Sequence, residues 1–170
     1  RLAGVMTGMA YQKDWQMAAE PVNFYHAKGV LDGYFETMGL SNQIRFEAAK
    51  DLKWMHPGRT AAVYLGDAYI GYVGQVHPAT ANAYDLKETY AFESDFEAII
   101  AAPKEVITQQ PIPKFPGVTR DVALLVDETV THQQIVKTIK ENGGKFLKDV
   151  HLFDIYQGKG IEDGKKSVAY

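Results

Sequence analysis

Two side chains of one predicted strand have the chemistry needed to hold an unpaired nucleic-acid base. Residues 150–158 have the apolar and aromatic composition of a strand and end at a glycine. Because successive side chains of a strand point to opposite faces, Asp154 and Tyr156 share one face, while Phe153 and Ile155 share the other. The ring offers a stacking surface and the carboxylate accepts hydrogen bonds from a base edge. Taken alone, the stretch also fits an ordinary half-exposed strand, which is the commoner case.

The sequence gives little support for a metal site, a cofactor site or a catalytic site. The five histidines have neither HxH nor HExxH spacing, and no carboxylate cluster joins them. The chain has no cysteine, so thiolate metal sites are excluded. Dinucleotide and phosphate-binding glycine loops are missing, as is a nucleophile elbow. We therefore expect no catalytic residue, no bound metal and no cofactor in this chain.

The first hundred residues predict an α+β domain with an antiparallel sheet. Asn23 is expected to cap a helix that ends at Gly39, and Gly29 and Gly33 within it are expected to permit close approach of another element. Residues 11–20 read as a loop or short helix anchored by Trp15. Strands are expected at residues 2–9 (buried), 43–48, 61–65, 69–76 and 90–95, and short helices at residues 79–84 and 96–101. Few crossover helices separate these strands, which favours antiparallel pairing.

A proline-rich stretch predicts the domain boundary. Four prolines lie between residues 103 and 116, and proline favours extended linkers. We assign residues 1–103 to the first domain, 104–112 to the linker and 113–170 to the second. The second domain reads as a strand at 120–126, a helix from the capping box at Thr131 to Gly143, and strands at 150–158 and 166–170. This order is three-quarters of a βαββαβ ferredoxin-like unit, and both chain ends look cut from something longer.

Composition and charge limit the possible partners. The net charge is −3, with 46% apolar residues and no apolar run of membrane-spanning length. Residues 1–103 carry 8 basic and 12 acidic side chains, and residues 104–170 carry 10 and 9. Neither half has the charge of a protein that coats DNA. Nucleic-acid binding would therefore depend on a few placed contacts, and we expect no membrane and no DNA partner.

An ordered series of short motifs resembles the C-terminal part of the phenylalanine–tRNA ligase β-subunit family. The motifs before the linker are HPGRTA at 56–61, GYVGQVHP at 71–78 and FE at 92–93. Those after it are KFP at 114–116, RDVAL at 120–124, FDIYQG at 153–158 and KKSVAY at 165–170. Each motif is short, but together they cover nearly the whole chain in the family's order.

The resemblance implies two modules. The first is a class II synthetase-like (catalytic-like) domain without an active site, and the second is an incomplete ferredoxin-fold anticodon-binding domain. The R-x-E pattern at Arg45–Glu47 is found on a strand of class II synthetases, but here nothing downstream completes an ATP site. In the family, two β subunits join two catalytic α subunits in a cytoplasmic heterotetramer that uses ATP and Mg²⁺. The resemblance therefore implies a non-catalytic chain that scaffolds the α subunit and binds the tRNA for phenylalanine.

The resemblance also extends the candidate RNA site. The strand that carries Asp154 and Tyr156 would face the anticodon. If residues 150–158 and 166–170 form a hairpin, Ser167 lies opposite Tyr156 and reaches the same base. Phosphate contacts are expected from three basic residues: Arg120, Lys165 and Lys166.

Two other readings stay open. One is a free-standing ferredoxin-like module that binds proteins and no RNA. The other is a small enzyme of acylphosphatase-like fold, which needs an arginine and an asparagine aimed at a phosphate loop. Asn142, however, falls at a helix end, so this reading ranks last.

Overall fold

The computed structural model spans residues 1–170 and describes all of them except Glu105, Ile107 and Gln110. It divides into two compact units, Arg1–Gln109 and Gln110–Tyr170. The three residues left out belong to the predicted linker, so that part of the linker assignment lies outside the described residues. None of the helices among the described residues is long and apolar enough to cross a lipid bilayer.

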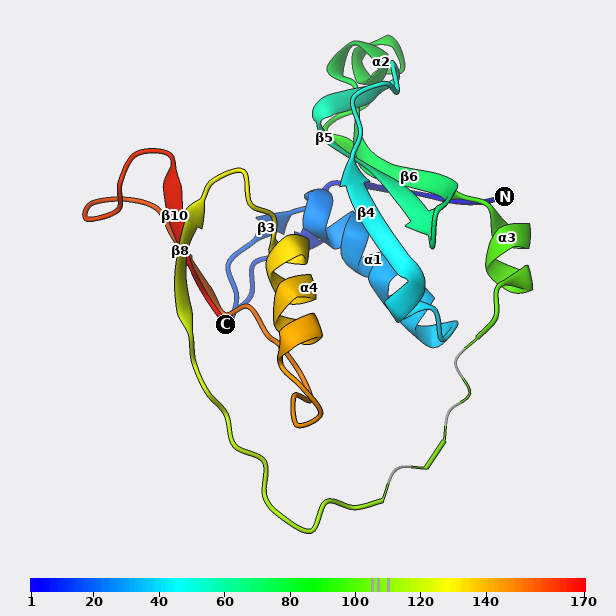
Figure 1. Cartoon of the computed structure of the whole chain (residues 1–170). Coiled ribbons are helices and arrows are strands. Elements are labelled where there is room, and N and C mark those ends of the chain that lie inside the picture. Colours follow the sequence, from blue (N-terminus) through cyan, green and yellow to red (C-terminus); the bar gives the residue numbers. More distant parts are fainter. Residues whose placement is uncertain (105, 107, 110) are drawn as a thin grey trace. The chain divides into compact units, whose positions relative to one another are not determined.

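Unit 1 is built on a five-stranded sheet in which every neighbouring pair is antiparallel (Figure 1). The strand order is β1-β7-β6-β5-β4. The bounds are β1 Leu2–Thr7, β4 Ile44–Ala48, β5 Met55–Leu65, β6 Ala68–Val76 and β7 Thr89–Ser94. The predicted antiparallel α+β architecture is confirmed. The strand expected at residues 2–9 is confirmed over Leu2–Thr7, but its predicted burial is wrong, because β1 lies at the sheet edge and leaves Val5 69% exposed.

Helix α1 (Phe24–Thr37) supplies most of the helical side of the unit 1 core. Ala27, Leu31 and Phe35 follow its helical period and are buried. They pack with sheet residues such as Val63 and Val73, and with Ile99 of α3 (Phe96–Ala101). The predicted cap is confirmed, since the Asn23 side chain accepts from the backbone N–H groups of residues 25 and 26. The remaining helices are α2 (Pro78–Ala83) and a short 3₁₀ turn, η1 (Ser41–Gln43).

Two glycines inside α1 have a different role from the one predicted. A Cβ at Gly29 or Gly33 would meet no atom within 4 Å, so neither glycine permits close approach of another element within unit 1. Gly39, in contrast, adopts φ +68° just beyond the helix and ends it as predicted.

Because the space at Gly33 is open, Gly33→Ala should stabilise unit 1. A glycine in a helix interior costs about 1 kcal/mol relative to alanine. We expect the free energy of unfolding to rise by about that amount in urea denaturation followed by circular dichroism. Gly66→Ala is the matched control, because its surroundings are equally open but its φ is +58°, so it should destabilise. A loss of stability in Gly33→Ala would contradict the open-space description.

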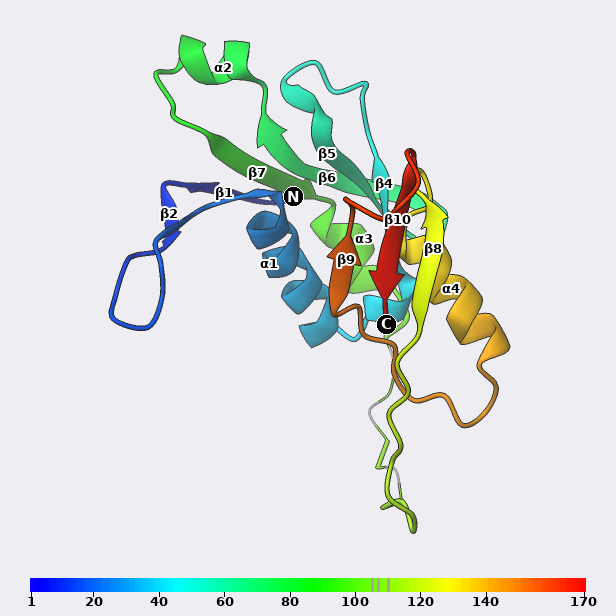
Figure 2. The same cartoon turned by 90° about the vertical axis from the view of Figure 1, so that its left-hand side faces the viewer.

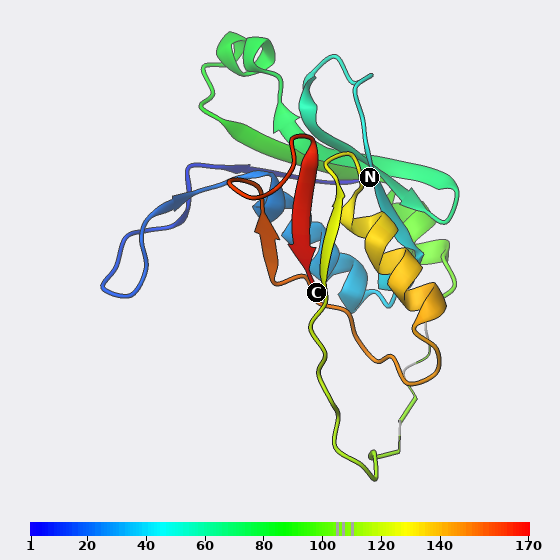
Figure 3. The same cartoon turned by 60° about the vertical axis from the view of Figure 1, so that its left-hand side comes forward.

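Unit 2 is a β-α-β-β arrangement with a three-stranded antiparallel sheet (Figure 3). The elements are β8 (Ala123–Asp127), α4 (His132–Asn142), β9 (Asp154–Tyr156) and β10 (Lys165–Ala169). The last strand lies between the other two, in the order β8-β10-β9. Helix α4 packs Ile135 against Val168 and Tyr170 to form a small core. The predicted element order and the capping box of Thr131 with Gln134 are confirmed.

Two predicted strands of unit 2 are shorter than expected. The strand assigned to residues 150–158 is β9, only three residues long, because Val150 and Leu152 pack on the α4 core instead of pairing. The strand assigned to residues 120–126 begins at Ala123. Val122 still exchanges backbone hydrogen bonds with Tyr170, but Arg120 precedes this pair and has no partner strand.

Candidate nucleic-acid interface

The pairing of β9 with β10 brings three of the predicted site residues onto one face. Tyr156 lies opposite Ser167, and Asp154 lies opposite Ala169. Residues at opposed positions of an antiparallel pair project from the same face. The neighbouring row, which contains Val168, packs against α4, so the face with Tyr156 and Ser167 is the one that α4 leaves open. The predicted opposition of Tyr156 and Ser167 is therefore confirmed.

The ring of Tyr156 is exposed but held in place. Its side chain is 47% exposed, and its hydroxyl donates to the Lys159 carbonyl oxygen at 3.1 Å. A Cβ at Gly158 would lie 3.0 Å from the Tyr156 hydroxyl oxygen, so glycine gives the ring room to lie against the following turn. A ring fixed before binding loses little conformational entropy when a base stacks on it.

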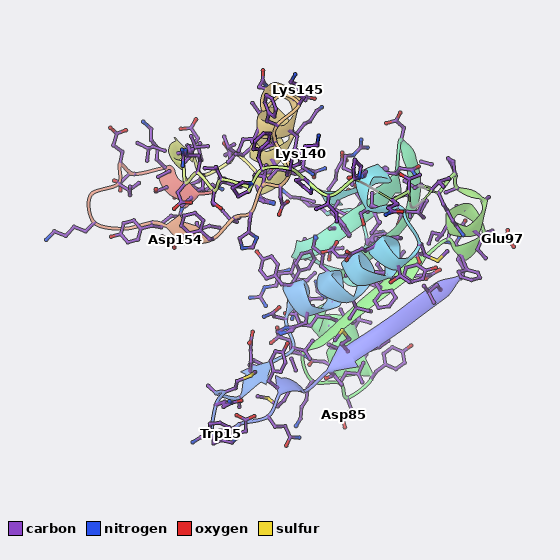
Figure 4. The ribbon with its side chains drawn as sticks, turned by 90° about the horizontal axis from the view of Figure 1, so that it is seen from below. Trp15, Asp85, Glu97, Lys140, Lys145 and Asp154 are labelled. Atoms are coloured by element: carbon purple, nitrogen blue, oxygen red, sulfur yellow. The ribbon has the colours of Figure 1, made fainter. Side chains whose placement is uncertain are left out.

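Asp154 presents an available carboxylate at the end of β9, and Figure 4 shows its side chain there. The residue opposite, Ala169, is too small to cover it. Within the described part of the chain, no hydrogen bond or ion pair engages this carboxylate. Its oxygen atoms are therefore available to N–H donors of a ligand.

The two predicted lysines lie on opposite faces of β10. Lys165 shares the open face with Ser167, whereas Lys166 alternates to the α4 side, where its ammonium group donates to the Glu128 carbonyl oxygen at 2.9 Å. The Lys165 ammonium lies 2.6 Å from a Glu162 carboxylate oxygen. That hydrogen bond raises the pKa of Lys165 and lowers the pKa of Glu162. The structure therefore brings Lys165 to the face as half of an ion pair and does not bring Lys166.

Arg120 is also separated from this face along the chain. It precedes β8, is exposed, and donates a guanidinium hydrogen bond to the Thr119 carbonyl oxygen at 3.2 Å. No contact between described residues joins it to Tyr156 or Asp154.

One member of the face was missed by sequence reasoning. Leu125 of β8 lies opposite Ser167 and is 54% exposed. Tyr156, Ser167 and Leu125 therefore form one row across the three strands. The signal was present in the alternation along residues 122–126, because the strand that packs Leu124 and Val126 against the α4 core must turn Leu125 outward.

The open face combines groups that suit an unpaired base. An aromatic ring and an apolar side chain give stacking and contact area, and a hydroxyl and a carboxylate give hydrogen bonds. The face has one cation, already paired, so it does not attract phosphate strongly. We define this set as the open face: Asp154, Tyr156, Ser167, Leu125 and Lys165.

The sheet of unit 1 shows no comparable arrangement at its R-x-E pattern. The Arg45 guanidinium lies 2.9 Å from a Glu47 carboxylate oxygen and 3.7 Å from one of Asp67. It also lies over the Tyr64 ring at 4.9 Å. Neighbours of its own sheet therefore occupy this arginine. Among the described residues, no group of three or more histidine or acidic side chains is arranged to hold a metal ion.

Comparison with known proteins matches both units. Residues 1–96 match the family model "Phenylalanyl tRNA synthetase beta chain CLM domain", and residues 113–170 match "Ferredoxin-fold anticodon binding domain". The chain is 47% identical to the phenylalanine–tRNA ligase β subunit of Lactiplantibacillus plantarum over 99% of its length. It is 48% and 45% identical to those of Geobacillus kaustophilus and Bacillus subtilis over its whole length. In each case it spans 21% of the relative's length.

Proposed function

The chain belongs to the phenylalanine–tRNA ligase β-subunit family, and on that premise we propose that unit 2 binds the anticodon of the phenylalanine tRNA. Unit 2 has the ferredoxin-fold anticodon-binding domain. The observation that carries the proposal is the row of exposed Tyr156 and half-buried Ser167, with Asp154 beside it, on the sheet face that α4 leaves open.

Each side chain of the open face has a distinct part in this proposal. The Tyr156 ring stacks on one anticodon base, a contact worth about 1–3 kcal/mol. Asp154 accepts from the N1–H and N2–H₂ donors of a guanine and repels the phosphate backbone, which favours a base edge. Ser167 lies within reach of the stacked base. Lys165 contacts phosphate after exchanging its Glu162 partner, whereas Arg120 contributes only as a more distant phosphate contact.

For unit 1 we propose a class II synthetase-like scaffold for the catalytic α subunit. The support is an antiparallel sheet with a helical layer on one face and an R-x-E arginine occupied by its own neighbours. The paired carboxylates offset the charge of this arginine, which weakens its attraction for a nucleotide phosphate. The chain alone is then not an enzyme. It contributes to a cytoplasmic assembly of two α and two β subunits in which ATP and Mg²⁺ bind elsewhere.

The anticodon proposal is tested with two stem-loop RNAs and the 170-residue chain. One carries the anticodon loop of the phenylalanine tRNA, and the other has the same stem with the three anticodon bases replaced. The open face has few groups that could contact the phosphate backbone of the RNA, so most of the affinity should depend on the bases. We expect the native loop to bind at least about 10-fold more tightly than the altered loop in a fluorescence anisotropy titration at fixed salt. Equal affinity for the two loops would contradict anticodon reading.

A second candidate function rests on apolar exposure in unit 2. Phe153 and Ile155 are 57% and 55% exposed, although they lie on the same side of the sheet as α4. An exposed pair of large apolar side chains also suits a protein-binding module without RNA affinity. The stem-loop titration separates the two functions, because a protein-binding module binds neither loop.

A further inference from the structure

Unit 1 carries an arm whose base belongs to the core through Val22 and Ala10 and whose tip projects outward. Strands β2 (Met9–Tyr11) and β3 (Glu20–Pro21) pair only with each other and form a sheet separate from the five-stranded one. A backbone hydrogen bond from Val22 to the Gly8 carbonyl oxygen closes the base of the arm at 2.9 Å. In Figure 2 the arm extends away from the rest of unit 1 beyond β1. We call residues 8–22 the arm.

Trp15 lies at the end of the arm and is 88% exposed, as Figure 4 shows. The sequence had suggested that this tryptophan anchors a loop or helix, which is wrong, because the chain extends outward here and the ring finds no core. Exposure of so large an apolar side chain leaves its contact area available to a partner.

The tip that presents Trp15 is nevertheless ordered by hydrogen bonds. The Asp14 carboxylate accepts from the backbone N–H groups of Gln16 and Met17 at 2.8 and 2.7 Å. The Asp14 N–H donates to the Met17 carbonyl oxygen at 3.1 Å. These bonds fix the backbone on both sides of Trp15 before any partner arrives. A preformed tip loses less entropy on binding than a flexible one.

The chemistry around the tryptophan indicates what kind of partner fits. Three further apolar or aromatic side chains of the arm are between 45% and 49% exposed: Met9, Tyr11 and Met17. The only cation of the arm is Lys13, against the carboxylates of Asp14 and Glu20. Its net charge of −1 disfavours the phosphates of RNA and disfavours an identical arm of a second copy. Tryptophan with adaptable methionines fits an apolar pocket on a different protein.

We propose that the arm inserts Trp15 into an apolar pocket on the catalytic α subunit. This inference rests on the proposed scaffold role of unit 1 and adds the residue that anchors the contact.

Fluorescence reports directly on this contact, because the chain has two tryptophans. Trp54→Phe leaves Trp15 as the sole tryptophan of this chain, and excitation at a wavelength that tyrosine does not absorb selects its emission. When the purified α subunit of the same organism is added, the Trp15 emission should shift to the blue and acrylamide should quench it less. In the unaltered background, Trp15→Ala should raise the Kd for the α subunit about 10-fold in calorimetry. Tyr25→Ala, which removes a 77% exposed ring elsewhere in unit 1, should leave it unchanged.

The outcomes separate the arm from the scaffold role. The α subunit could bind without changing the Trp15 emission and with the same Kd for Trp15→Ala as for the unaltered chain. This result would overturn the arm contact but leave the scaffold role in place. Absence of binding by the unaltered chain overturns both, while the stem-loop titration still decides the anticodon proposal. A blue shift that appears with rising concentration of the chain alone assigns the arm to a second copy and overturns the proposal. Unchanged circular dichroism of Trp15→Ala confirms that the variant is folded.

Discussion

Tyr156→Ala is expected to weaken binding of the phenylalanine tRNA anticodon loop about 10- to 100-fold. The ring is exposed at 47% and lies in one row with Ser167 and Leu125, so its removal takes away the stacking surface of the open face. Loss of one base–aromatic stack costs about 1–3 kcal/mol, which corresponds to about 5- to 150-fold in affinity and so includes that range. Fluorescence anisotropy with a labelled stem-loop measures the effect.

Two matched variants separate stacking from other contributions. Tyr156→Phe keeps the ring and loses only the hydrogen bond to the Lys159 carbonyl oxygen, so its affinity should stay within about 3-fold of the unaltered chain. Lys159→Ala removes a nearby charge and should weaken binding less than Tyr156→Ala, with a smaller dependence on salt. Equal losses for Tyr156→Ala and Lys159→Ala would contradict stacking.

The second large effect concerns the stability of unit 1. Phe35 is 1% exposed and packs from α1 into the main core. Phe35→Ala removes most of a buried ring and leaves a cavity, which typically costs about 3–5 kcal/mol of the free energy of unfolding. Urea denaturation, followed by far-ultraviolet circular dichroism, should show this loss as a lower midpoint for unit 1.

Tyr25→Ala provides the control on the same helix. Tyr25 lies in the first turn of α1 and is 77% exposed, so its truncation should change the free energy of unfolding by less than about 0.5 kcal/mol. A loss below 1 kcal/mol in Phe35→Ala would contradict the placement of this ring at the centre of the core.

Features that depend on neighbouring residues were well predicted from the sequence. Asn23 and Thr131 cap their helices, because a short polar side chain satisfies N–H groups only two or three residues away. The hairpin at residues 66–67 likewise follows from a glycine with φ +58° between two apolar runs. In each case the deciding contacts lie within a few residues, so the local sequence contains them.

Features that depend on a distant partner were predicted less well. Strand β9 is three residues long because Val150 and Leu152 pack on the α4 core instead of pairing with β10, and no local pattern in residues 150–158 shows this. The same holds for Gly33. The open space around it depends on where the other elements of unit 1 pack, which the sequence of the helix does not show. Trp15 was expected to anchor residues 11–20, yet the core of unit 1 forms without it.

The candidate RNA site falls between these cases. The shared face of Asp154, Tyr156 and Ser167 follows from strand alternation and a correct hairpin register. The same alternation places Lys165 and Lys166 on opposite faces, although both had been expected to contact phosphate. Which face α4 covers depends on the packing of Ile135 with Val168, a contact between distant segments.

The strand order of unit 2 has a consequence for how the protein folds during synthesis. Strand β10 is central in the sheet, but it follows β8 and β9 in the chain. Neither outer strand has a partner until β10 has left the ribosome, since β8 and β9 do not pair with each other. Unit 1 leaves the ribosome earlier, while β8 waits with unpaired backbone groups for a contact more than thirty residues away, Asp127 with Lys165. Exposure of those groups to other chains is therefore greatest in the interval before residues 165–169 emerge.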